Sequence, residues 1–171
     1  MGGLTAGAAA LDRDAVRSRL ATMGNSVNQL VAAGRLDRAR LDRDPASGMV
    51  VERLLALLAD LAFEINRQAA AALGDAPDSP AAAAGAAARA GLIDERLVAA
   101  LAPPDGPHHL LVQQYLDTEP ERVAGVVSDA VAAYREYVRQ VTAWLAGGSG
   151  PVAVRRTGLP GWVATTTRRP V

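Results

Sequence analysis

Between two predicted helices lies Pro107-His108-His109-Leu110-Leu111-Val112-Gln113-Gln114-Tyr115, the stretch around which the rest of this 171-residue chain is arranged. It contains both histidines of the sequence. Pro103, Pro104 and Gly106 interrupt the helix before it, and a helix start follows at Thr118. If the chain carries out chemistry, we expect it in this stretch.

Length and composition indicate a single domain with a core of small and aliphatic side chains. Half of the residues are apolar but only 4% are aromatic, so alanine, leucine and valine must fill the core. A length of 171 residues suffices for one domain. The absence of cysteine excludes disulfides, thiolate chemistry and cysteine-bound zinc, as is typical of a protein from a reducing cytosol.

The charges are unevenly distributed along the chain. Residues 147–171 contain four arginines and no acidic residue, which leaves 14 arginines against 18 acidic residues in the first 146, a net charge of −4. An acidic body disfavours binding to a phosphate backbone. The most apolar run, residues 54–62, is far shorter than the roughly 18 to 20 residues that span a bilayer. With no basic, apolar leader at residues 1–11, we expect a cytoplasmic protein without membrane association.

Apolar residues at steps of three and four predict five main helices, in an all-α, up-and-down bundle. Their ends carry helix signals: a capping Asp, Ser or Thr, a proline in the first turn, or a glycine after the last turn. These signals are Asp12 and Gly34, Asp44-Pro45 and Gly74, Ser79-Pro80 and Gly91, Asp94 and Pro103, and Thr118-Glu119-Pro120-Glu121. The mixed-charge residues 35–44 are expected to form a loop or a short helical turn.

The same signals divide the chain into three parts. Residues 1–11 are expected to be a flexible N-terminus and residues 12–146 the helical domain. Residues 147–171 begin with a linker composition, Gly147-Gly148-Ser149-Gly150-Pro151, and continue as a basic, irregular tail. Within the domain, Tyr134, Tyr137 and Trp144 are expected to be core or interface anchors.

Two phrases, Ala88-Arg89-Ala90-Gly91-Leu92-Ile93-Asp94 and the stretch from Gly106 to Tyr115, carry a family resemblance. From about Leu11 to Leu145 the chain resembles the HepT-type toxins of the HEPN (higher eukaryotes and prokaryotes nucleotide-binding) superfamily. Members typically show Ala-Gly-Val-Ile-Asp followed, after a helix, by Gly-Phe-Arg-Asn-x-Leu-Val-His-x-Tyr. The resemblance implies a HEPN-like helical bundle that forms homodimers and carries a metal-independent ribonuclease site.

The two chemical residues of the family phrase are replaced in this sequence. His108 stands at the position of the arginine, which steadies negative charge on the phosphate, and Gln113 at that of the histidine, which transfers protons. Glutamine cannot exchange a proton at usable pH, and loss of a general acid or base costs roughly 10²–10⁴-fold in rate. The resemblance therefore implies a degenerate site, His108, His109 and Gln113.

Three hypotheses remain open. The first is a catalytically degenerate binding or regulatory module, and the second is an active ribonuclease that uses His108 or His109. The third is a structural helical protein outside the family. The two histidines also fit solvated or hydrogen-bonded loop positions, and their surroundings do not indicate a metal site. We expect no cofactor.

Tyr115 keeps its place in the family phrase. By resemblance it is the residue to which a partner, a minimal nucleotidyltransferase antitoxin, attaches AMP. Packing of this side chain in the dimer cleft is an equally good explanation. Homodimerisation is also expected from the wide apolar faces of the predicted helices.

Overall fold

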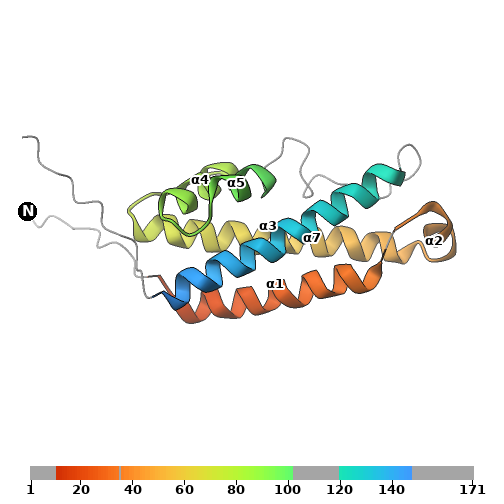
Figure 1. Ribbon diagram of the computed structural model, residues 1–171, viewed down its shortest axis with the longest axis horizontal. Helices are drawn as coiled ribbons and strands as arrows, with labels where there is room; N and C mark the ends of the chain where they lie inside the picture. The colour runs from red at the N-terminus through yellow and green to blue at the C-terminus, as the bar shows by residue number, and fades with distance from the viewer. Residues whose placement is uncertain (1–10, 35, 102–119, 148–171) are drawn as a thin grey trace, which may run out of the picture.

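The computed structural model of the protein describes residues 11–34, 36–101 and 120–147. Within these ranges every element is helical and none is a strand (Figure 1). The helices are α1 (Arg13–Ala33), α2 (Arg38–Arg43), α3 (Ala46–Ala72), α4 (Pro80–Arg89), α5 (Glu95–Leu101) and α7 (Pro120–Ala146). The prediction of an all-α fold with five main helices is confirmed. The short α2 lies in the charged connection, where a loop or a short helical turn was predicted.

Local capping interactions explain most of the helix ends. The carboxylate of Asp12 accepts a hydrogen bond from the amide of Ala15 at 3.0 Å, and the Ser79 hydroxyl accepts one from the amide of Ala82 at 3.3 Å. α1 ends at Gly34, whose φ of 69° lies in the left-handed region that favours glycine. These start and stop signals were predicted from the sequence and are confirmed.

The prediction that the Asp44 carboxylate caps α3 is wrong. α2 occupies the residues just before it, so Asp44 ends that helix and donates its backbone N–H to the carbonyl of Arg40 at 2.8 Å. The carbonyl of Asp44 then accepts from the Ser47 hydroxyl at 2.7 Å. α3 starts at Ala46 with Pro45 as its N-cap and without a side-chain capping bond. Asp44 therefore ends α2, although the local sequence pattern predicted that it would cap α3.

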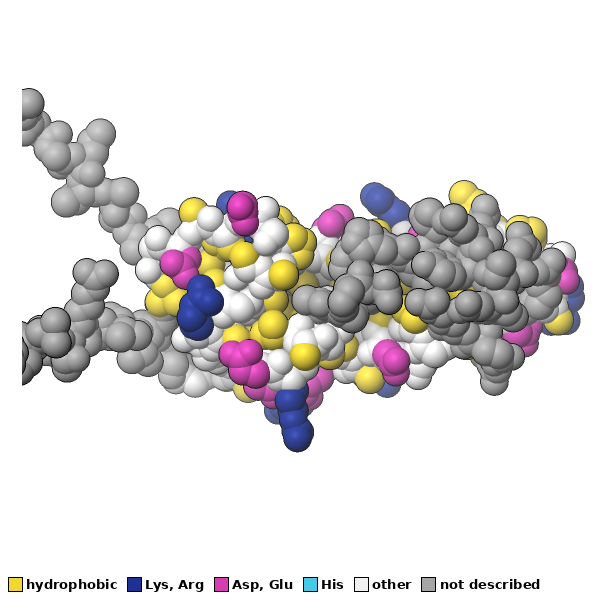
Figure 2. Space-filling model, turned by 90° about the horizontal axis from the view of Figure 1, so that it is seen from above, with side chains coloured by type: hydrophobic (Ala, Val, Ile, Leu, Met, Phe, Trp, Pro, Cys, Tyr) yellow, Lys and Arg dark blue, Asp and Glu magenta, His cyan; other side chains and the backbone are white. Residues whose placement is uncertain are grey.

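The three long helices α1, α3 and α7 run along the molecule, and α4 and α5 pack on one side of them (Figure 1). α1 contacts both α3 and α7, α4 packs mainly on α3, and α5 packs on α7. The space-filling view in Figure 2 looks onto the side that carries α4 and α5. Fully buried side chains in this core include Met23, Leu30, Leu36, Leu55, Leu58, Ile65, Leu92, Tyr134 and Tyr137.

A buried polar pair joins α3 to α7 inside this core. The Tyr137 hydroxyl donates to Oδ1 of Asn66 at 2.8 Å and lies 3.3 Å from the carbonyl oxygen of Ala62. Both side chains are almost completely buried. A hydrogen bond satisfies the polar groups that each would otherwise bury without a partner. Tyr134 is buried nearby, which confirms the prediction that these tyrosines are packing anchors.

The charged connection contributes to the core as well. Leu36 and Leu41 are buried, at 1% and 7% exposure, although the residues around them alternate in charge. The sequence pattern indicated a solvated connection and missed these two side chains. Two apolar residues five positions apart give too short a period to be recognised as a helix face.

Candidate functional site

The four residues predicted to form the site, His108, His109, Gln113 and Tyr115, lie outside the described residues, in the range 102–119. The structure describes the helices on either side of that range. α5 ends at Leu101, seven residues before His108, and α7 begins at Pro120, five residues after Tyr115. The packing of α5 and α7 therefore fixes the positions of the two helix ends to which residues 102–119 are joined.

A pair of reciprocal hydrogen bonds fastens the start of α5 to α7. Gln140 accepts from the backbone N–H of Asp94 through Oε1 at 2.8 Å. Its Nε2 donates to Oδ2 of Asp94, also at 2.8 Å. The other carboxylate oxygen of Asp94 caps α5 by accepting from the amide of Leu97 at 2.8 Å. Asp94 is the last residue of the first family phrase. It caps the start of α5 and holds this helix against α7, the helix that follows the second phrase.

The carboxylate of Glu136, one turn earlier on α7, also binds the Gln140 side chain that holds Asp94. It accepts hydrogen bonds from Arg139 and, at 2.8 Å, from Nε2 of Gln140. The bonds from Arg139, followed by the bond from Gln140, lower the pKa of Glu136 to about 2. Glu136 is therefore ionised near neutral pH and holds the pair in place. A carboxylate with so low a pKa is a poor proton donor.

A second paired carboxylate joins α1 to α3. Glu64 accepts from Arg67 at 2.9 Å, and the guanidinium of Arg19 lies 3.8 Å away on α1. The hydrogen bond from Arg67 is the main cause of the lowered pKa of Glu64. Glu64 and Arg67 thus form an ion pair on the surface of α3, and the arrangement indicates a structural role.

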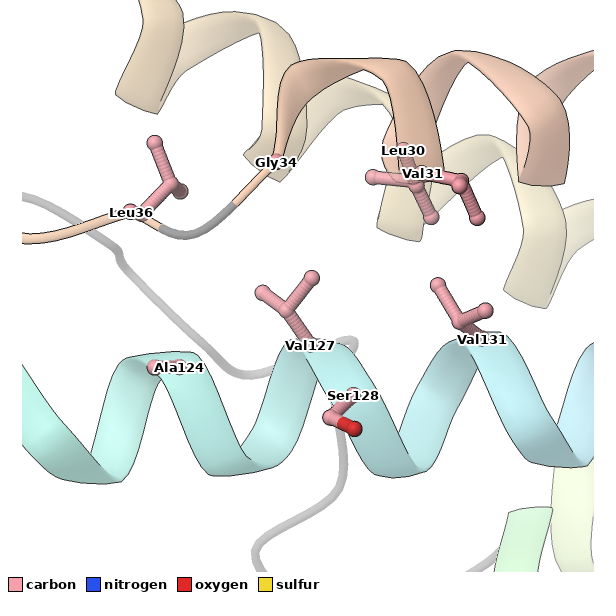
Figure 3. Close-up of a pocket in the computed structure, with 8 residues that line it drawn as sticks. All are labelled: Leu30, Val31, Gly34, Leu36, Ala124, Val127, Ser128 and Val131. Atoms are coloured by element: carbon pink, nitrogen blue, oxygen red, sulfur yellow. The ribbon is translucent and has the colours of Figure 1, made fainter.

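A groove with a volume of about 370 Å³ lies between the C-terminal end of α1 and the first turns of α7 (Figure 3). Val127 and Val131 point from α7 toward α1, and the Ser128 hydroxyl points away from α1. No lining residue is ionisable, so the groove can hold apolar groups but has no proton to transfer. It is lined by Leu30, Val31, Gly34, Leu36, Ala124, Val127, Ser128 and Val131.

A second groove, of about 430 Å³, lies toward the other end of the same two helices. Arg17 is its one charged lining residue. Sequence analysis did not identify either groove, because helical spacing shows which residues share a face but not which helices pair. The grooves are lined by residues more than 90 positions apart, such as Leu30 and Val127.

The described residues show neither a metal site nor a membrane span. No group of three or more His, Cys, Asp or Glu side chains within the described ranges is placed to hold a metal ion. None of the helices described here combines the length and the apolar character needed to cross a membrane. The described helices therefore offer a frame and two apolar grooves, and the candidate chemistry stays with residues 107–115.

Comparison with models of protein families identifies a match. The sequence matches the family described as Ribonuclease HepT-like over residues 23–141. This range starts within α1, ends within α7 and includes both family phrases. None of the curated proteins matches the sequence.

Proposed function

The chain belongs to the HepT-like ribonuclease family, and from this premise we propose that it is a homodimeric HEPN-fold protein whose ribonuclease site is degenerate and which acts by binding partners. The observation that carries the proposal is the glutamine at position 113, where the family phrase has its histidine. An amide side chain has no proton to exchange near neutral pH. The arginine of the phrase is also replaced, by His108.

The rest of the chain offers few substitutes for the missing proton carrier. The sequence has two histidines, both within 107–115, and no cysteine. Among the described carboxylates, Glu64 and Glu136 have pKa values that arginine partners lower further. The groove beside α7 is lined by residues without ionisable groups. His108 and His109 are the candidates to replace Gln113, because the ordinary pKa of histidine is the closest to neutral pH. They define the alternative function as an active ribonuclease.

An RNA cleavage assay separates these two functions. The wild type and a His108→Ala, His109→Ala variant are incubated with labelled RNA in the presence of EDTA. We expect equal, background-level cleavage from both proteins. Cleavage by the wild type that the double alanine variant loses would show an active enzyme and overturn the degenerate site.

Restoring the family residues supplies the positive control for this assay. The variant His108→Arg, Gln113→His carries both chemical groups of the family phrase. We expect its cleavage rate to exceed that of the wild type by roughly 10²–10⁴-fold, the usual contribution of one general acid or base. A variant Gln114→His, which adds a histidine at the neighbouring position, is the matched control and should remain at background.

Tyr115 is the second functional residue of the proposal. By its place in the phrase it is the AMP acceptor for a minimal nucleotidyltransferase partner. Incubation with ATP and a nucleotidyltransferase encoded by a neighbouring gene should raise the mass of the chain by one AMP. The same incubation of Tyr115→Phe should leave the mass unchanged. AMP on the Phe variant would place the modification elsewhere.

A further inference from the structure

The two grooves lie along one line, the contact between α1 and α7. Residues of both helices line each groove, and one groove lies toward each end of the pair. The lining residues on α7 share one helix face, at steps of four, seven and four: Val127, Val131, Val138 and Thr142. In Figure 3, Val127 and Val131 point across the first groove toward α1. The two grooves therefore open on the same side of the α1 and α7 pair.

The spacing of the two grooves matches the length of a helix of a few turns. Leu20 on α1 lines the second groove and Val31 lines the first, and these residues lie about 16 Å apart at the usual rise of 1.5 Å per residue. On α7 the distance from Val127 to Thr142 is about 22 Å by the same measure. A helix along this line can place aliphatic side chains in one groove from positions i and i+3, and in the other from i+11 and i+14.

A positive charge stands between the two grooves. Arg135 follows Val131 by four positions and precedes Val138 by three, so it lies on the same face of α7. We call the lining residues of both grooves, together with Arg135, the α1–α7 furrow. Its charged members are Arg17, which is bound to Asp14 at 2.7 Å, and Arg135. The Arg135 side chain is exposed, and its guanidinium has no ion pair or hydrogen bond to another described residue.

We propose that the α1–α7 furrow binds an amphipathic helix of a partner protein that carries an aliphatic cluster for each groove and, between them, an Asp or Glu that faces Arg135. This surface rests on the proposed function, in which the chain acts by binding partners. Opposite charges across an interface fix the register and the choice of partner. An aliphatic helix without the acid would instead remove the guanidinium of Arg135 from water without pairing it, which is costly.

The same charge disfavours two occupants supplied by the chain itself. A second copy that docked furrow to furrow would bring Arg135 close to its own equivalent, because a two-fold interface pairs the same patch on both chains. The sequence from residue 148 onward has four arginines and no acidic residue, so it offers no carboxylate side chain for Arg135. The homodimer proposed above would therefore form through another face of the chain.

A pair of synthetic helices tests the proposal on the full chain. The first is a fluorescent alanine- and glutamine-based peptide of roughly 18 residues, with leucines at i, i+3, i+11 and i+14 and a glutamate at i+7. The second carries a lysine in place of the glutamate. Fluorescence anisotropy measures their dissociation constants. We expect the glutamate peptide to bind roughly tenfold more tightly than the lysine peptide, because one opposite-charge contact becomes a like-charge contact.

Reversing the charge of the chain should reverse this preference. Arg135→Glu should bind the lysine peptide roughly tenfold more tightly than the glutamate peptide. Arg53→Glu, at an exposed arginine of α3 outside the furrow, is the matched control and should keep the wild-type preference. Circular dichroism checks that both variants keep the helix content of the wild type. Equal affinity of the wild type for the two peptides, or no binding below about 1 mM, would overturn the proposal.

A second pair of variants locates the peptide in the grooves. Val31→Arg places a long charged side chain in the first groove and should weaken binding of the glutamate peptide by roughly tenfold. Val50→Arg, at a valine of similar exposure on α3 (53% against 47%), should bind like the wild type. Unchanged affinity of Val31→Arg would overturn the furrow. The RNA assay judges the degenerate site separately, since the furrow can fail while the wild type stays inactive toward RNA.

Discussion

Tyr137 illustrates how one buried hydroxyl determines the packing of two long helices. Its hydroxyl donates to Asn66 on α3, and both groups are removed from water. Removing one partner leaves the other buried without a hydrogen bond, which costs more than the bond itself contributes. Sequence analysis identified Tyr137 as an anchor, and the structure adds its polar partner.

Tyr137→Phe should lower the free energy of unfolding by about 1 to 3 kcal/mol, because it leaves Oδ1 of Asn66 unsatisfied. Chemical denaturation followed by circular dichroism measures this change. A double-mutant cycle with Asn66→Ala isolates the pairwise contribution. A coupling energy near zero would contradict the assigned bond.

The buried tyrosines also predict how stability depends on pH. Burial raises the pKa of Tyr137 well above its ordinary value of 10, and burial also raises the pKa of Tyr134. In the folded chain these phenols keep their protons, whereas in the unfolded chain they lose them near pH 10. The free energy of unfolding should therefore be unaffected by these groups below pH 10 and fall as pH rises above it.

Thermal denaturation between pH 8 and pH 11, roughly one to two units either side of the ordinary phenol pKa, measures this dependence. The Tyr134→Phe, Tyr137→Phe variant removes both groups, so its melting temperature should fall less steeply over this range. Equal slopes for the variant and the wild type would show that the phenols ionise freely in the folded chain.

The short helix α5 depends on a contact with α7 to keep its place. It has seven residues, too few for an isolated helix to be stable. The Asp94 and Gln140 hydrogen bonds supply a fixed start, and Leu97 is buried in the core. α5 leads directly to the range that contains the family's chemical positions. A substitution at Gln140 should therefore loosen α5, which precedes His108 in the sequence, although Gln140 itself lies on α7.

Gln140→Ala should lower the free energy of unfolding by about 1 kcal/mol, because Asp94 loses its partner on α7. Hydrogen exchange of the amides in residues 95–101 should become faster. Arg17→Ala is the control, since the pairing of Arg17 with Asp14 stays within α1 and is exposed. If both variants exchange α5 amides at the wild-type rate, the hydrogen bonds do not anchor that helix.

The described core of the molecule ends close to the end of α7. Val141 and Leu145 are buried in it, and Trp144 packs against it. The basic residues of the sequence after 147 lie outside the described ranges. The division into a helical domain and a tail therefore remains a prediction that deletion can test.

A chain that ends at Gly147 should keep the helix content and melting temperature of the whole protein within about 2 °C, less than the 2–4 °C expected from 1 kcal/mol in a chain of this size. A chain that ends at Gln140 loses Val141 and Leu145, each worth about 1.5 to 3 kcal/mol when buried, and should be strongly destabilised. Thermal denaturation compares the two. A large loss of stability in the chain that ends at Gly147 would show that residues 148–171 belong to the folded domain.

Local sequence was enough to predict most helices and the family. Asp12, Ser79 and Asp94 each cap a helix through a bond to a residue three positions away, and such bonds depend on few neighbours. The substitution of histidine by Gln113 is equally visible without a structure. The error at Asp44 arose where a second helix ended beside the first turn of the next.

Local sequence signals could not predict which distant segments of the chain pack against each other. Gln140 meets Asp94 across 46 positions, and the groove beside α7 combines Leu36 with Val127. Helical periodicity identifies an apolar face, but many partners can cover the same face with similar gain, and the packing of whole helices chooses among them. The helices and the altered chemical residues thus follow from local sequence, whereas the anchor of α5 and the two grooves between α1 and α7 depend on which helices come together.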